Sequence, residues 1–120
     1  MTRALWFGLG WLEALGITVL CLWPLRELPG PDLPWTDKLY HLAAFGLLMW
    51  WFAVALPRAR WPSTALYVLG LGIFIEFAQG FVPFRSPSVA DVAADALGVL
   101  AGAALARLTP RALPAWQPRA

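Results

Sequence analysis

The sequence predicts an all-α integral membrane protein, a four-helix bundle with its N- and C-termini in the cytoplasm. Three observations predict it: an excess of apolar residues, four long apolar runs, and proline-rich stretches between those runs. Hydrophobic residues make up 60% of the 120 residues and charged residues 13%, with a mean hydropathy of +0.64. A soluble domain carries about 25% charged residues, so we expect lipid to cover much of this surface.

Each apolar run is long enough to cross a bilayer, which requires about 20 helical residues. The runs cover about residues 4–25, 37–57, 63–83 and 89–107. Prolines at 29–34, 57–62 and 83–87 interrupt the pattern between them. Because the runs lack the alternation of barrel strands, and only helices or closed barrels satisfy their backbone in lipid, we expect helices.

The first run follows Arg3 and is expected to be a retained span. A signal peptide has an apolar region of only about 7–15 residues, shorter than this run. Cys21 is the one cysteine and is expected to pack as a small apolar side chain. Residues 1–107 are expected to form one transmembrane domain. Residues 108–120, which contain prolines and arginines, are expected to form a cytoplasmic tail without a regular helix.

Basic residues set the predicted orientation. One side of the membrane holds six: Arg3, Arg58, Arg60, Arg107, Arg111 and Arg119. The other side holds three: Arg26, Lys38 and Arg85. The positive-inside rule makes the side with six the cytoplasmic one. The basic residues are thus explained by topology, and no nucleic acid is expected as a partner.

Polar residues of the spans gather in the predicted outer half of the bundle. They are Asp37, Lys38, His41, Glu76, Gln79, Arg85, Asp91 and Asp95. Within each helix their spacing is three or four residues, which places them on one helix face. Gly98 and Gly102 continue the face of Asp91 and Asp95 as a small-xxx-small surface, on which another helix can pack closely. The carboxylates are therefore expected to point into the bundle, as a binding pocket.

Structural roles remain open for most of these residues. Thr36 and Ser88 are candidate N-caps, which would leave Asp37 and Asp91 as first-turn residues favoured by the helix dipole; alternatively, Ser86-Pro87 starts the last helix with proline at its first position. The remaining alternatives are interfacial anchoring for Lys38 and Arg85, packing for His41 and an interhelical hydrogen bond for Gln79.

Capping does not account for Glu76 and Asp95, which lie inside their predicted helices. An ionisable residue within a span indicates a functional site by default, with structural ion pairing as the alternative. Glu13 lies in the middle of the first span, away from the others, and the sequence suggests no role for it.

These residues, in this order, resemble the VanZ-like family of bacterial membrane proteins. The resemblance lies in Asp37-Lys38-Leu-Tyr-His41, Glu76-Phe-Ala-Gln79, Phe84-Arg85-Ser86, and Asp91 with Gly98 and Gly102. Two positions depart from the family pattern: Leu42 replaces an aromatic residue, and Asp95 replaces a frequent asparagine. The resemblance implies a multi-pass protein of the bacterial cytoplasmic (inner) membrane. It also implies a link to the cell envelope, as in resistance to the glycopeptide teicoplanin.

Two functions follow as hypotheses, besides a purely structural polar network. The first is an accessory protein whose pocket binds a lipid head group, a lipid-linked cell-wall precursor or a lipophilic glycopeptide. The second is a small membrane enzyme that acts on a lipid-linked phosphate. No cofactor is predicted except a divalent metal as an option, with His41, Glu76 and Asp91 as candidate ligands. The sequence has no HExxH, GxSxG or P-loop motif, and it leaves a homo-oligomer open.

Overall fold

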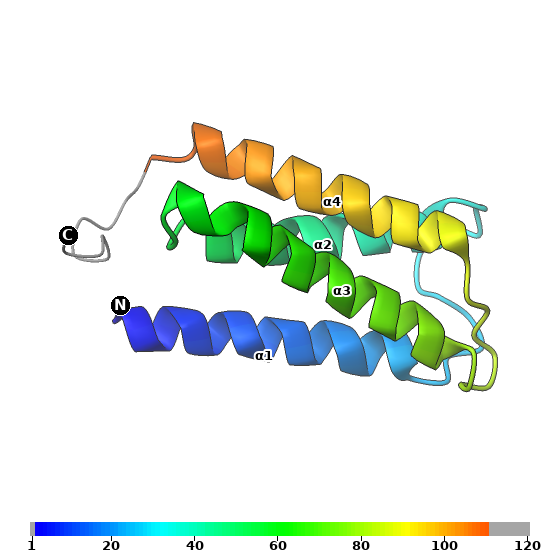
Figure 1. Ribbon diagram of the computed structural model, residues 1–120. Coiled ribbons are helices and arrows are strands. Elements are labelled where there is room, and N and C mark those ends of the chain that lie inside the picture. The colour runs from blue at the N-terminus through cyan, green and yellow to red at the C-terminus, as the bar shows by residue number, and fades with distance from the viewer. Residues whose placement is uncertain (1, 111–120) are drawn as a thin grey trace.

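The computed structural model describes residues 2–110 and, within them, contains four α-helices and no strand. The helices are α1 (Arg3–Leu22), α2 (Thr36–Ala53), α3 (Trp61–Gln79) and α4 (Val89–Leu108), with a short 3-10 turn, η1 (Arg58–Arg60), before α3. They run alternately up and down, so that α1 begins and α4 ends at the same end of the bundle (Figure 1). The all-α prediction is confirmed. Residues 111–120 of the predicted tail lie outside the described residues.

Three of the four helices are long and apolar enough to cross a membrane: α1, α3 together with η1, and α4. The fourth, α2, has 18 residues and opens with Asp37, Lys38 and His41, which lower its hydropathy. It is nevertheless the helix that supplies the fully buried core residues Phe45 and Met49. The helix that is not apolar enough for a span is thus also a central one.

Three helices end earlier than the sequence predicts: α1 ends at Leu22, three residues before the predicted end, and α2 and α3 each end four residues early. α2 ends at Ala53 because the chain tightens into i→i+3 hydrogen bonds, such as Leu56 N–H to Ala53 O at 3.2 Å. The Trp61 indole N–H then donates to the carbonyls of Ala53 and Leu56 at 2.9 and 3.2 Å. α3 ends at Gln79, where Gly80 and the residues after it form similar turns before Pro83.

The two predicted helix caps differ in outcome. Ser88 is the N-cap of α4, and its hydroxyl accepts a hydrogen bond from the Ala90 N–H at 3.2 Å. Thr36 does not cap α2, so that prediction was wrong: Thr36 is the first helical residue and Trp35 is the N-cap. The Thr36 hydroxyl instead donates to the Pro31 carbonyl at 2.8 Å, which fixes the loop before the helix.

α2 and α4 make the closest helix pair, because glycines face backbone across their contact. A Cβ atom at Gly98 would overlap the Leu42 carbonyl and lie 3.0 Å from the Gly46 nitrogen. A Cβ at Gly102 would overlap the Gly46 carbonyl. Only glycine permits so close an approach. The same contact brings the first turns of α2 and α4 side by side.

α1 packs against α2 and α3, with polar contacts at both of its ends. Near its beginning, the Trp6 and Trp51 indoles stack with centroids 3.8 Å apart, and each indole N–H donates to the other residue's carbonyl at 2.9 Å. Along its middle, an apolar cavity of about 620 Å³ separates α1 from α2 and α3. The end opposite the tryptophan pair is held by the polar site described next.

Candidate functional site

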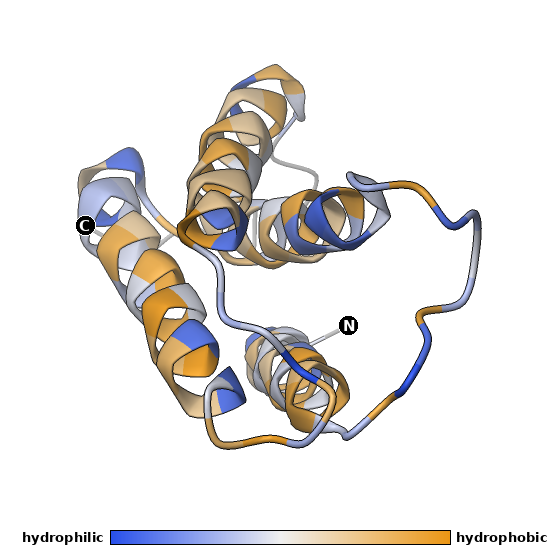
Figure 2. Ribbon diagram, turned by 90° about the vertical axis from the view of Figure 1, so that its right-hand side faces the viewer, coloured by the Kyte–Doolittle hydropathy of each residue, from blue (hydrophilic) through white to orange (hydrophobic). Residues whose placement is uncertain are grey.

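The polar residues of the spans meet at one end of the bundle, where α1 and α3 end and where α2 and α4 begin. Figure 2 looks onto this end and shows hydrophilic stretches in the nearest turns of α2, α3 and α4. The loops 23–35 and 80–88 cover it. The site is therefore formed by three helices and roofed by two loops.

His41 and Asp95 form the deepest part of the site. The His41 Nδ1 lies 2.8 Å from Asp95 Oδ1, and the two residues are 3% and 0% exposed. A carboxylate accepts, so the Nδ1–H donates and the Nε2 of a neutral ring carries the lone pair. Asp95 thereby fixes both the tautomer and the orientation of the imidazole.

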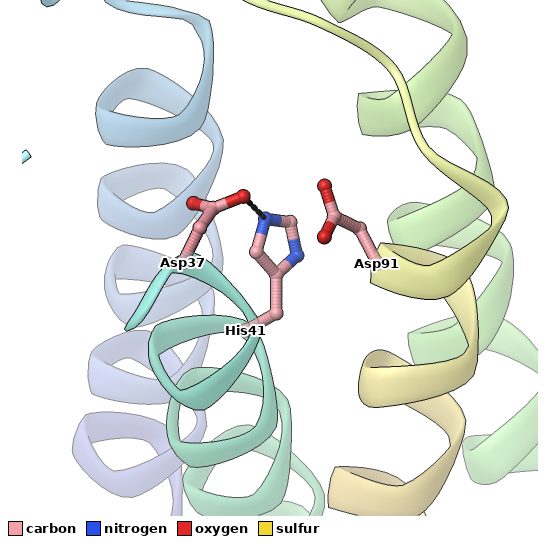
Figure 3. A group of neighbouring side chains, drawn as sticks. All are labelled: Asp37, His41 and Asp91. Carbon is pink, nitrogen blue, oxygen red and sulfur yellow. Dashed lines mark ion pairs between the residues drawn. The ribbon is translucent and has the colours of Figure 1, made fainter. Parts of the chain in front are cut away.

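Nε2 of His41 points toward the carboxylate of Asp37, and the carboxylate of Asp91 lies across the ring from Asp37, as Figure 3 shows. Asp37 Oδ2 lies 3.8 Å from Nε2, beyond hydrogen-bond length. Asp91 comes from α4 and is 2% exposed, and its Oδ1 lies 3.4 Å from the Lys38 ammonium. One ligand atom from each of Asp37, His41 and Asp91 lies within 4.8 Å of the others.

Glu76 has a structural contact that the sequence did not indicate. Its Oε1 accepts a hydrogen bond at 3.0 Å from the backbone N–H of Ser88, the N-cap of α4. In a capping box the acidic residue three positions after the N-cap, here Asp91, would accept this bond. Glu76 accepts it from another helix, which leaves the Asp91 side chain free to turn toward His41 and Lys38. α3 also ends three residues after Glu76, so this carboxylate is less deep than the sequence suggested.

Gln79 and Arg85 join the site to the end of α1. The Gln79 amide donates to the Cys21 carbonyl at 2.9 Å. The Arg85 guanidinium donates to the carbonyls of Leu20 at 2.8 Å and Trp23 at 3.0 Å. These carbonyls belong to the last turn of α1, which has no intrahelical donors and which favours a cation through its dipole.

Several buried oxygens of the site have no hydrogen-bond partner among the described residues. They are Glu76 Oε2, Gln79 Oε1, Asp91 Oδ1 and Asp95 Oδ2. Among residues 2–110, Lys38 forms an ion pair with Asp91 alone of the four carboxylates of the site, and the hydrogen bonds of Arg85 go to α1 carbonyls. Buried carboxylates without compensation are costly, so these oxygens can accept a positively charged or hydrogen-bonding group.

Two cavities open beside these residues and share part of their lining. The first, of about 490 Å³, is mainly polar and lies under the 23–35 loop. The second, of about 310 Å³, is mainly apolar, lies between α1 and α2, and includes His41 in its lining. Asp37 and Arg85 line both cavities, together with Leu25 and Leu28. A polar chamber thus adjoins an apolar one at two charged side chains.

The loop between α1 and α2 contributes residues to the lining of the candidate site, although the sequence indicated only a connection there. Arg26, Glu27 and Asp32 line the polar cavity. Arg26 also lies over the Phe84 ring at 4.8 Å, which joins the two loops. Phe84 has a φ of 65°, an unusual backbone conformation outside glycine, directly before Arg85. The charged residues of this loop could have indicated a contribution to a polar site. Nothing in the sequence, however, shows that the loop folds back over the helix ends.

Glu13 does not belong to the site. It lies in α1, and its Oε1 is buried without a hydrogen-bond partner among the described residues. The structure gives it no functional role.

Comparison with known proteins identifies one family. The family model for VanZ/LLP1 matches residues 5–110, which include all four helices except the first two residues of α1. No curated protein and no solved structure matches the chain.

Proposed function

Because the chain belongs to the VanZ/LLP1 family of membrane proteins, we propose that it is an envelope accessory protein of the bacterial inner membrane that binds a phosphate-bearing lipid. The polar cavity would hold the head group and the apolar cavity the adjoining part of its hydrocarbon chain. The observation that supports this is the shared border of the two cavities at Asp37 and Arg85. In an amphiphile the polar head group is joined directly to the hydrocarbon chain, as the polar cavity here adjoins the apolar one.

Charges in the polar cavity indicate which head groups suit it. Its lining holds two positive side chains, Arg26 and Arg85, and three negative ones, Glu27, Asp32 and Asp37, a formal net charge of −1. Two of the five N–H groups of Arg85 donate to α1, so the others are free to donate to a phosphate oxygen. The carboxylates suit hydroxyl or ammonium groups. A phospholipid and a polyprenyl-phosphate-linked cell-wall precursor share this chemistry, and a lipophilic glycopeptide shares the hydroxyls and the chain.

The apolar cavity offers the sharpest test, because Ala44 lines it and its neighbour Ala43 is exposed on the outside of α2. Ala44→Leu adds side-chain volume inside a cavity of about 310 Å³, whereas Ala43→Leu adds the same volume toward lipid. The purified chain in detergent is titrated with phosphatidylglycerol, a polyprenyl phosphate, or a teicoplanin-type glycopeptide, and bound ligand is counted by native mass spectrometry.

We expect Ala44→Leu to reduce binding of the preferred ligand at least tenfold and Ala43→Leu to leave it unchanged. The three ligands tested separately identify the source of the head group. Equal binding by both variants, with both folded by circular dichroism, would contradict the proposal. So would the absence of binding by the unaltered chain with all three ligands.

A membrane enzyme is the alternative, and one observation favours it. His41 is oriented by Asp95 in the manner of a general base held by a carboxylate, and its Nε2 lines the apolar cavity side of the site. This function predicts turnover of a polyprenyl phosphate by the purified chain and its loss in His41→Gln. Binding without turnover would favour the accessory role.

A further inference from the structure

The site has a feature that lipid binding alone does not explain, namely its excess of buried carboxylates. We propose that Nε2 of His41 and the carboxylates of Asp37 and Asp91 bind one divalent transition-metal ion. The proposal deepens the proposed function, since such an ion would also accept a phosphate oxygen as a ligand. The lipid is not needed for the ion to bind.

The positions of the three donors fit a single ion. Ligand atoms of Asp37, His41 and Asp91 lie within 4.8 Å of one another, and they come from two helices whose close contact is fixed by glycines (Figure 3). Zinc–ligand bonds are about 2.0–2.2 Å long, so two ligands of one ion lie about 3–4.2 Å apart. The 3.8 Å between His41 Nε2 and Asp37 Oδ2 falls in this range and is too long for a hydrogen bond.

His41 has the arrangement of a metal-binding histidine. Metal-bound histidines donate the N–H of their other ring nitrogen to a carboxylate or carbonyl, which fixes the tautomer and strengthens the donor. Asp95 accepts this bond at 2.8 Å and is fully buried. The Nε2 lone pair therefore faces Asp37 with no hydrogen between them unless the ring is protonated. The lone pair and the Asp37 carboxylate repel each other, and a cation between them would attract both.

Asp91 gives an independent indication that a cation belongs here. It is 98% buried and its Oδ1 has no hydrogen-bond partner among the described residues. Among residues 2–110 its one ion-pair partner is Lys38, at 3.4 Å and with a side chain 39% exposed. That separation exceeds the 2.7–2.9 Å of a strong charge-assisted hydrogen bond. Lys38 thus compensates Asp91 incompletely, and an ion on the His41 side would complete the compensation.

The donor set indicates the class of metal. One imidazole and two carboxylates suit Mn²⁺ or Zn²⁺, whereas Mg²⁺ and Ca²⁺ prefer oxygen ligands alone. Three protein ligands leave coordination positions for water or substrate. Asp37 also lines the polar cavity, so these positions would open toward the proposed head group.

The test uses the full chain in detergent, freed of metal with EDTA and titrated with Mn²⁺ or Zn²⁺ alone, without lipid. Mn²⁺ is followed by the loss of its free-ion electron paramagnetic resonance signal, and Zn²⁺ by calorimetry and by competition with Mn²⁺. We expect one ion per chain, with Mg²⁺ binding at least tenfold more weakly. His41→Gln and Asp91→Asn should each weaken binding at least tenfold. Glu13→Gln, which also replaces a buried carboxylate by an amide within a span, should leave it unchanged.

Two further variants keep the test decisive if those proteins fold poorly. Lys38→Met removes the competing ammonium and should bind the metal at least as tightly as the unaltered chain. Asp95→Asn retains an oxygen to accept the Nδ1–H and should weaken binding much less than Asp95→Ala, for which we expect a 10- to 100-fold loss.

Absence of bound metal at millimolar Mn²⁺ and Zn²⁺ in the folded chain would overturn the proposal, as would equal affinity in His41→Gln. Loss of metal binding in Lys38→Met would also overturn it, because the lysine would then be required. Lipid binding in EDTA is measured separately. If lipid binds and metal does not, the ion site alone is wrong; if metal binds and no lipid does, the proposed function alone is wrong.

Discussion

The contact between α2 and α4 yields the sharpest prediction about stability. In Gly98→Ala, the new Cβ would overlap the Leu42 carbonyl and lie 3.0 Å from the Gly46 nitrogen and 3.2 Å from the Leu42 carbonyl carbon. All three atoms are backbone, so no side chain can turn away. The two helices would have to separate along a contact that also carries His41 and Asp95.

The expected magnitude follows from a comparison with Gly70→Ala in α3. Gly70 has no atom within 4 Å of the position of a Cβ, so only helix propensity changes there. Alanine is favoured over glycine by about 0.8–1.0 kcal/mol in a helix interior, and this gain applies to both variants. Overpacking costs about 1–3 kcal/mol, and the backbone neighbours of Gly98 put it in the upper half of that range. We expect Gly98→Ala to be less stable than Gly70→Ala by about 2–3 kcal/mol.

The measurement is reversible unfolding in mixed detergent micelles, followed by the circular dichroism of the helices. Both variants are compared with the unaltered chain under one set of conditions, so that the propensity contribution cancels between them. A difference below about 0.5 kcal/mol, the scatter of an ordinary surface substitution, would refute the backbone contact between α2 and α4.

Three more predictions concern single contacts. Trp61→Phe should lower the free energy of unfolding by about 1–3 kcal/mol, because the carbonyls of Ala53 and Leu56 lose their indole donor; an unchanged unfolding curve would contradict this. Glu76→Ala should cost about 0.5–2 kcal/mol as a lost cap, whereas Glu76→Gln keeps an acceptor for the Ser88 N–H and should cost much less. Equal losses in unfolding experiments would mean that the charge matters, not the acceptor. Arg85→Lys keeps the charge but not the forked geometry, so hydrogen exchange should quicken at the last turn of α1 and stay unchanged at the Trp6 end.

The helical class and the place of the polar site could be predicted from the sequence, because both depend on spacing. Runs of apolar residues of sufficient length determine helices in lipid, and the spacing of Asp91, Asp95, Gly98 and Gly102 determines one helix face. That face lies against α2, with Asp95 fully buried.

Details that depend on contacts distant in sequence could not be predicted. The end of α2 is stabilised by Trp61, and the N-cap of α4 is stabilised by Glu76 from α3. No local pattern reports either contact. The sequence left Arg85 as either a pocket residue or an interfacial anchor, whereas in the structure its guanidinium donates to carbonyls at the end of α1. The carbonyls at a helix C-terminus attract a cation just as an anionic ligand does. The sequence alone does not show which of these two partners an arginine in a loop has.

The polarity of α2 has a consequence for how the protein is made. α2 is the one helix of residues 2–110 that is long enough for a membrane span but not apolar enough, and it leaves the ribosome before α3 and α4. Its partner surface, the glycine face of α4, is synthesised last. We therefore expect entry of α2 into lipid to depend on the arrival of α4, because Asp37, Lys38 and His41 make lipid unfavourable for α2 alone. Substitutions at Gly98 or Gly102 would then act during biogenesis as well as on the finished fold, and would lower the amount of protein in the membrane.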